Sequence, residues 1–358
     1  MDMNEQEVSN CISGLGRLGA EWSNLTPKIR KSLGDAFILT IGVGGLPPRG
    51  LAMTVHGLGR MNADFATLPP NFRSSIMSAI QKISPKVNSL EISNVLYGMG
   101  KMGTSFSVDE IALDEESIAA TTNSNATPFL IPGLAMNGVS SDELDISIAG
   151  RSSRKVSKSD AESTVGMSRK ARDSLLEALG RESWQLNAQG IANSLWGLML
   201  MDAQWWVLSP ILQGKLLEIV KREANRMNEQ ELCNTIYALG RLGVKWLNVP
   251  SETRYSVLNA IEDSSSVIAP EGVVMTLLGL GRMQLTWSDM SYTLVSALSS
   301  SVERVVQSSS ERTLSGLIHA LATIGAQWGD LSSEVQSALI DGIANGDARK
   351  REEQKANY

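Results

Sequence analysis

The sequence has few of the residues from which disulfide frameworks, metal sites and catalytic centres are built. Its 358 residues include two cysteines and two histidines. Cys11 and Cys233 lie far apart without a Cys-x-x-Cys spacing, so neither a disulfide framework nor a zinc site is indicated. His56 and His319 have no nucleophile pattern, metal-ligand spacing or phosphate-loop motif near them. We therefore expect a protein that is not an enzyme and that holds no metal and no cofactor.

Long apolar runs are also missing, because no stretch approaches the ~18 residues that span a bilayer. The first ten residues, MDMNEQEVSN, are acidic and lead directly into a repeat, so no targeting peptide is expected in this sequence. Residues 107–168 carry ten acidic and four basic side chains and account for the net charge of −6. The rest of the chain is neutral. It lacks a general basic field for nucleic acid, although a local basic stripe is compatible with it.

What the chain does have is one thirteen-residue phrase that occurs seven times. The phrase reads Asn-x-(Ile/Val/Leu)-(aromatic or His)-(Gly/Ala)-Leu-Gly-Arg-(Leu/Met)-Gly-x-x-Trp, and we number its positions 1 to 13. Most copies are 41 residues apart, one interval is 43 and one is 99. A fixed period of this size predicts a stacked repeat array. The seven copies begin at Asn10, Met53, Asn94, Asn193, Asn234, Met275 and Gly316.

Apolar residues at positions 3, 6 and 9 predict one face of a helix, which we call helix A. Position 10 is often Gly or Asn, which suits the left-handed residue that ends a helix. Position 13 is aromatic in all seven copies, and we expect it to fold back and fill the gap between helices. The aromatic residues are Trp22, Phe65, Phe106, Trp205, Trp246, Trp287 and Trp328.

A second helix, helix B, is predicted after each aromatic. A short turn that often holds proline, such as Pro27, Pro70 or Pro210, precedes an amphipathic segment, and proline is common at the start of a helix. Residues 252–261 and 334–343 are two such segments. Two helices in each 41-residue unit, without strand-like alternation, predict an all-α fold: an α-solenoid of about seven two-helix repeats.

Positions 5 and 7 are small in nearly every copy, for example Gly57 and Gly59 in repeat 2. A glycine inside a helix costs about 0.5–1 kcal/mol relative to alanine, so its recurrence implies a compensating benefit. Close packing of helix A on its neighbour is one explanation. Room for the backbone of a ligand is the other.

The 99-residue interval contains one repeat and an insert of about 58 residues, which divides repeat 3. The insert is rich in Ser, Thr, Asn and Ala and has little periodicity, which predicts a disordered loop at a turn that tolerates insertions. We therefore expect four segments. They are repeats 1–3 (residues 1–106), a disordered insert (107–168), repeats 4–7 (169–346) and a charged tail (347–358).

Positions 1, 4 and 8 fall on one face of helix A and carry amides, planar rings and cations. In a stack of repeats the side chains at each position would form a row, with neighbouring members about 8–10 Å apart. An amide can bond a base edge, a ring can stack on a base, and a cation can pair with phosphate. The candidate RNA-binding residues are Asn10, Asn94, Asn193, Asn234, His56, Tyr97, Trp196, Tyr237, Arg17, Arg60, Lys101, Arg241 and Arg282.

A structural explanation of the same positions also stands. Arginine in the last turn of a helix is favoured by the macrodipole by roughly 0.3–1 kcal/mol. Asparagine can hold the turn between repeats, and the rings can pack between neighbouring helices A. This accounts for each position separately, but not for all three sharing one face.

Two stretches carry a family resemblance: residues 189–198 (QGIANSLWGL) and 234–243 (NTIYALGRLG). They resemble the Asn-x-Leu-Trp-Ala-x-Ala-Lys-Leu-Gly core of octotricopeptide and heptatricopeptide repeats. Those families are helical-repeat RNA-binding proteins of chloroplasts and mitochondria that often end in a RAP domain, of which this sequence shows no sign. The resemblance covers nearly all of the chain outside the insert and tail. It implies organellar RNA processing, stability or translation, and hence a mitochondrial or chloroplast location.

Two functions therefore remain open. The first is a non-enzymatic solenoid that binds single-stranded RNA. The second is an armadillo-like scaffold that holds an extended peptide, which the neutral repeats favour. Under either hypothesis we expect a monomer without membrane or metal partners.

Overall fold

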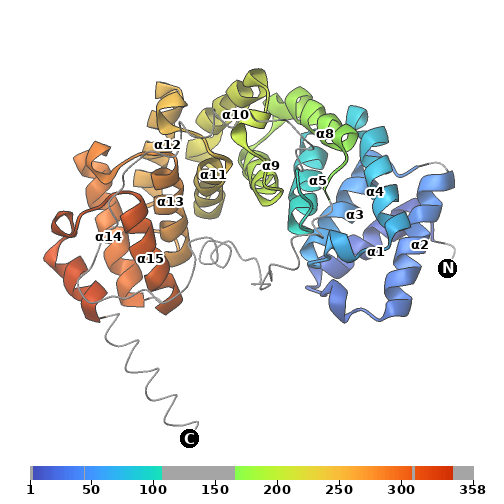
Figure 1. Cartoon of the computed structure of the whole chain (residues 1–358), viewed down its shortest axis with the longest axis horizontal. Coiled ribbons are helices and arrows are strands. Elements are labelled where there is room, and N and C mark those ends of the chain that lie inside the picture. Colours follow the sequence, from blue (N-terminus) through green and yellow to red (C-terminus); the bar gives the residue numbers. More distant parts are fainter. Residues whose placement is uncertain (1–2, 44, 107–165, 309–310, 342–358) are drawn as a thin grey trace, which may run out of the picture.

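The fold is an arch of packed helices (Figure 1). The computed structural model describes the chain over four ranges, residues 3–43, 45–106, 166–308 and 311–341. Within them all regular structure is helical apart from an isolated bridge between Ser105 and Gly166. This confirms the predicted all-α solenoid. Both the segment 107–165 of the expected insert and the expected charged tail lie outside the described residues.

Each repeat contributes one helix A and one helix B, and in all repeats but the third a short 3₁₀ turn at the position-13 aromatic joins them. Helices A are α1 (Glu5–Arg17), α3 (Pro48–Arg60), α5 (Ser89–Lys101), α9 (Ala188–Leu200), α11 (Glu229–Leu242), α13 (Pro270–Arg282) and α15 (Glu311–Thr323). Helices B are α2 (Pro27–Val43), α4 (Pro70–Ile83), α8 (Arg169–Glu182), α10 (Pro210–Glu223), α12 (Ser251–Ser264), α14 (Tyr292–Ser308) and the helical residues 333–341.

The helices A form one continuous row along the arch. Each contacts the next, and α5 contacts α9 although the insert separates them in sequence. In Figure 1 the helices A line the inner side of the curve and the helices B cover its outer side. The two ends of the arch are repeat 1, with α1 and α2, and repeat 7, with α15. No described helix is long and apolar enough to cross a membrane.

Local sequence explains where these helices begin and end. Pro27, Pro70 and Pro210 each occupy the first helical position, where the missing N–H costs nothing. Asn4, Asn88 and other asparagines cap helices A through their side-chain oxygens. After helix A, position 10 has a positive φ, between 51° and 87°, in every repeat, which confirms the predicted left-handed stop. These residues are Gly19, Asn62, Gly103, Asp202, Gly243, Gln284 and Gly325.

The small residues at positions 5 and 7 let neighbouring helices A touch backbone to backbone. A Cβ placed on Gly98 would lie 2.5 Å from the carbonyl oxygen of Val55 in the preceding repeat. One placed on Gly59 would lie 2.8 Å from the oxygen of Gly98 in the following repeat. Both distances are shorter than real Cβ contacts. The packing explanation of the glycines is thus confirmed, and the compensating benefit is dense contact between helices.

The aromatic at position 13 also joins consecutive repeats. Its side chain is buried in five repeats and half-buried at Trp205 and Trp328, as the predicted filling of the gap between helices requires. Its backbone N–H donates to the position-9 carbonyl of the next repeat, with N···O distances of 2.7–2.9 Å. The five donors are Trp22, Phe65, Phe106, Trp246 and Trp287.

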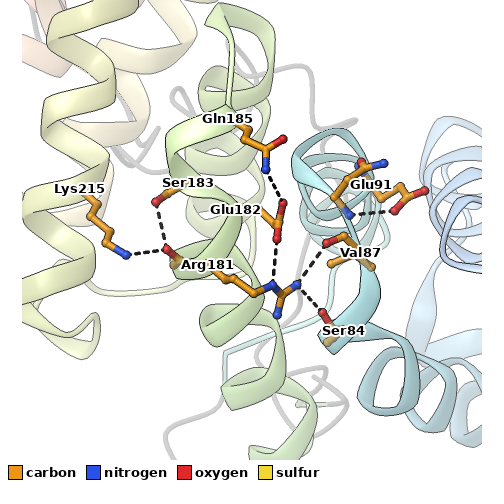
Figure 2. A network of polar contacts seen from close by, with 10 residues as sticks. Ser84, Val87, Glu91, Arg181, Glu182, Ser183, Gln185 and Lys215 are labelled. Carbon is orange, nitrogen blue, oxygen red and sulfur yellow. Dashed lines mark hydrogen bonds and ion pairs between the residues drawn. The ribbon is translucent and has the colours of Figure 1, made fainter.

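A third contact between repeats, which the sequence analysis did not predict, links helices B. Arg181, near the end of α8, donates to the carbonyl oxygens of Ser84 and Val87 in the preceding repeat at 2.9 and 3.1 Å, and it also bonds Glu182 (Figure 2). Arg304 of α14 donates in the same way to the carbonyl oxygens of Ser265 and Ile268, both at 2.9 Å. Arg222 repeats the pattern between α10 and the end of repeat 3. We call these three side chains the arginine clamps.

The junction between repeats 4 and 5 has none of the three contacts. Position 7 of repeat 4 is Met199 and position 5 of repeat 5 is Ala238, so no glycine allows close approach there. Within the described residues Trp205 N–H makes no bond to Leu242. The clamp position of α12 is Asp263, an acid. A cleft of about 340 Å³ lies at this junction, lined by residues of repeats 4 to 6.

We predict opposite effects of one substitution at two equivalent glycines. Gly98→Ala is expected to destabilise the array by about 2–3 kcal/mol, because its Cβ collides with backbone that cannot move alone. Gly14→Ala is expected to stabilise it by about 0.5–1 kcal/mol, because nothing lies within 4 Å of that Cβ. Urea unfolding of both variants in dilute solution measures this. Equal shifts of the midpoint would contradict the packing role.

We also predict that the array opens first between repeats 4 and 5. The backbone amide of Trp205 should exchange with deuterium faster than those of Phe106 and Trp246, by roughly a factor of five to ten, since a hydrogen bond contributes about 1 kcal/mol. Hydrogen exchange resolved by residue measures this. Protection of Trp205 equal to that of the other two aromatics would show that this junction is no weaker than its neighbours.

Candidate nucleic-acid interface

Packing leaves only a narrow part of each helix A open to solvent. Positions 5 and 7 face the neighbouring helices, whereas positions 1 and 8 are exposed or half-buried in most repeats and position 4 ranges from half-buried to fully buried. The helices A that carry these positions line the inner side of the arch in Figure 1. We call these three positions the polar strip. Three of the predicted contact residues are exposed, and two are buried. The exposed ones are Asn10, Arg17 and Arg60; the buried ones are Trp196 and Tyr237; the half-buried ones are Asn94, Asn193, Asn234, His56, Tyr97, Lys101, Arg241 and Arg282.

The cations of the polar strip are aligned by the glycine contacts. The Cβ of Arg60 is 3.2 Å from a Cβ placed on Gly16, and that of Lys101 is 3.1 Å from one placed on Gly59. In repeats 2, 3, 4 and 7, position 8 thus lies directly beside position 7 of the repeat before it. Leu200 interrupts the row in repeat 4. The cations therefore form two groups, one over repeats 1–3 and one over repeats 5 and 6.

Arg17 and Arg60 are the most accessible of these cations. Both side chains are exposed, and neither forms an ion pair with an acidic residue in the described ranges. Placed at the ends of neighbouring helices, they give the inner side a local positive patch in an otherwise neutral array. Such a patch suits an anionic ligand.

The rings at position 4 contact one another in pairs across two junctions. His56 and Tyr97 have centroids 5.5 Å apart, and Trp196 and Tyr237 have centroids 5.9 Å apart, with tilted planes in both cases. The Arg282 guanidinium lies over the Tyr237 ring, 5.5 Å from its centroid. Such contacts are favourable for packing neighbouring helices.

Burial divides these rings into two groups. Tyr237 is 1% exposed and Trp196 is 7% exposed, so a base cannot stack on either without separating the repeats. For this pair the structural explanation accounts for what is observed. His56 and Tyr97 are only half-buried and keep surface that a ligand can reach.

The amides of position 1 run through three consecutive repeats. Asn94, Asn193 and Asn234 are half-buried, and within the described part of the chain their side chains form no hydrogen bonds. They therefore do not hold the turns between repeats. That role belongs to other asparagines, for example Asn88 and Asn187, which cap α5 and α9. The position-1 amides are available to bond a ligand.

Burial and neighbouring charges shift the pKa values of three rings in the polar strip. Burial and, to a smaller extent, the guanidinium groups of Arg60 and Arg17 lower the pKa of His56 below its ordinary value of 6.5. Burial and Arg282 likewise lower the pKa of His319. The pKa of Tyr97 is raised by burial, which Arg60 opposes. Both histidines are thus neutral rings near pH 7.

His319 belongs to the polar strip but is missing from the predicted contact residues. Its side chain is half-buried, and Arg282 of the preceding repeat is close enough to affect its pKa. The 41-residue spacing from Leu278 to His319 identifies it as a position-4 residue. Among the described residues no group of three or more His, Cys, Asp or Glu side chains is arranged to hold a metal ion.

Comparison with known proteins adds no family to this description. No protein-family model matches the chain, and neither does any curated protein.

The two histidines give a direct test of the arrangement. Arg60→Gln should raise the pKa of His56 towards 6.5 and leave that of His319 unchanged, because Arg60 lies near His56 alone. Titration of the ring protons by NMR measures both. The unfolded chain protonates His56 near pH 6.5 and the folded one only below it, so the free energy of unfolding should fall as pH drops through 6.5. A pKa of His56 above 6.5 in the native protein would refute this arrangement.

Proposed function

We propose that this chain is a non-enzymatic helical-repeat protein that binds single-stranded RNA along the inner side of its arch. The observation that carries the proposal is the alignment of exposed cations and hydrogen-bonding amides on consecutive helices A. Cations at position 8 would pair with phosphates and amides at position 1 would bond base edges. Helical-repeat proteins that read about one base per repeat use two or three side chains in this way.

The burial of two rings refines the proposed contacts. Arg17, Arg60 and Lys101 would hold the backbone at one end of the array, and Arg241 and Arg282 would do so beyond the interruption at Leu200. Asn94, Asn193 and Asn234 would contact bases between the two groups. His56 and Tyr97 offer the accessible ring surface, while Trp196 and Tyr237 support the helices from below. The resemblance to octotricopeptide and heptatricopeptide repeats supports a role in organellar RNA processing, stability or translation.

A peptide-binding scaffold is the second candidate. The three aligned amides without internal hydrogen bonds favour it, because an extended peptide backbone offers donors and acceptors at regular intervals. The two candidates depend on different parts of the polar strip. RNA needs the cations, whereas a peptide backbone needs the amides.

Charge reversal at the exposed cations tests RNA binding. Arg17→Glu with Arg60→Glu should weaken binding of a random single-stranded RNA pool at least tenfold. It should also reduce the slope of log K against log salt by about 1.4, at about 0.7 per phosphate contact. Filter binding at increasing salt measures both. These arginines are preferable to Arg241 and Arg282, because Arg282 packs on Tyr237 and its loss would disturb the fold.

A matched variant controls for net charge. Lys31→Glu with Arg169→Glu makes the same change on helices B, at side chains that are 77% and 81% exposed, and should leave RNA affinity nearly unchanged. Equal losses in both variants, or no binding by the unaltered protein at submillimolar RNA, would refute the proposal. The peptide scaffold would then be supported if the protein captured one partner protein in the presence of RNase. The triple variant Asn94→Ala, Asn193→Ala, Asn234→Ala should no longer capture that partner.

A further inference from the structure

The free end of repeat 1 has the surface of an internal junction rather than that of a capped end. Leu18 is 84% exposed, and nothing lies within 4 Å of a Cβ placed on Gly14. Ile29 and Leu39 of α2 are 45% and 58% exposed. The terminal repeats of solenoids usually carry a polar outer face that keeps them soluble. We call these four residues the head face.

Equivalent positions in the later repeats show what such a face packs against. Position 9, which is Leu18 in repeat 1, is at most 1% exposed in every other repeat, because the preceding repeat covers it. The equivalents of Ile29 are at most 5% exposed, and one of them, Phe72, packs edge-on against Phe37 of the repeat before it at 5.2 Å. The equivalents of Gly14 meet the preceding helix A backbone at 2.5–2.8 Å in four repeats.

The partner that fits the head face is therefore the trailing side of a repeat of this same kind. Such a repeat would bring a small residue at position 7 against Gly14. Its position-13 aromatic would donate its N–H to the carbonyl oxygen of Leu18, which accepts no hydrogen bond in the described part of the chain. The same pairing occurs at five internal junctions.

The chain itself carries the complementary surface at its other end. In repeat 7, position 7 is Ala322, which is exposed, and position 13 is Trp328, which is only half-buried. The methyl group of Ala322 means that the two helices would meet slightly farther apart than at the internal junctions, where position 7 is glycine. Within the described residues the backbone N–H of Trp328 donates to no acceptor. We call Ala322 and Trp328 the tail face. Figure 1 shows repeat 1, which carries the head face, and repeat 7, which carries the tail face, at opposite ends of the arch, so a second copy can extend the solenoid.

We propose that the head face of one copy binds the tail face of another, so that the protein associates head to tail. The two faces differ, so the contact is heterologous and each added copy leaves one head and one tail free. Association then continues beyond the dimer unless the superhelix closes. This departs from the monomer expected from the sequence, because the repeat pattern alone does not show which surfaces stay uncovered.

Sedimentation equilibrium of the full chain over a concentration series tests the proposal. The mean mass of the unaltered protein should rise above the 38.6 kDa of one chain and pass that of a dimer. Leu18→Glu should weaken association at least tenfold, because it places a carboxylate in the contact. The matched control is Leu247→Glu, since Leu247 is equally exposed at 84% but lies outside both faces. It should associate like the unaltered protein.

Mixing two variants tests the direction of the contact. Leu18→Glu keeps an intact tail face and Ala322→Arg keeps an intact head face, so each alone should stay monomeric and an equimolar mixture should form dimers only. Circular dichroism checks that both remain helical. A mass of one chain at every concentration of the unaltered protein overturns the proposal. So does association of Ala322→Arg alone, which would mean that two head faces meet.

Discussion

Backbone contact between neighbouring helices A sets the geometry of the array. Glycine at positions 5 and 7 brings one helix so close to the next that a Cβ at Gly98 would lie 2.5 Å from a carbonyl oxygen. That distance fixes how each helix is turned relative to its neighbour. It therefore decides which side chains are buried between helices and which remain on the inner side of the arch. The aromatic N–H bonds and the arginine clamps lie at the two sides of this contact and maintain it.

Positions 1, 4 and 8 lie on one helical face but differ in how much of each side chain stays exposed. Rings at position 4 lie between neighbouring helices A, and the larger pair, Trp196 and Tyr237, is buried although it spans the one junction that lacks the glycine contact within the described repeats. Cations at position 8 lie at the helix ends, where they extend beyond the contact, and amides at position 1 lie at the other end of the strip. An inner surface built this way has little exposed aromatic area. Any ligand it holds is recognised mainly through charge and hydrogen bonds, which makes binding sensitive to salt.

Much of this fold could be predicted from the sequence because each repeat is a local object copied seven times. The 41-residue period predicted the solenoid, position 10 predicted the helix stops, and the glycines predicted the packing. The arginine clamps were missed although Arg181 and Arg222 are one period apart, since a charge near a helix end has a local explanation already. For Tyr237 the sequence left two explanations open, ligand contact and packing between helices A, and its burial agrees with the second. A helical wheel describes one helix and cannot show how closely its neighbours approach.

The junctions between repeats are not all alike, and the differences do not follow from the consensus sequence of the repeat. Where repeat 4 meets repeat 5, Met199 and Ala238 replace the glycines of the close contact, and Asp263 replaces the clamp arginine. Contacts between neighbouring repeats govern the stability of a solenoid, so a junction that lacks three of these contacts is where we expect the array to open first. The cations of the polar strip are interrupted at nearly the same place, by Leu200. A ligand that spans both cation groups must therefore cross the junction that lacks the three contacts, and its binding would restrict the angle between the repeats on either side.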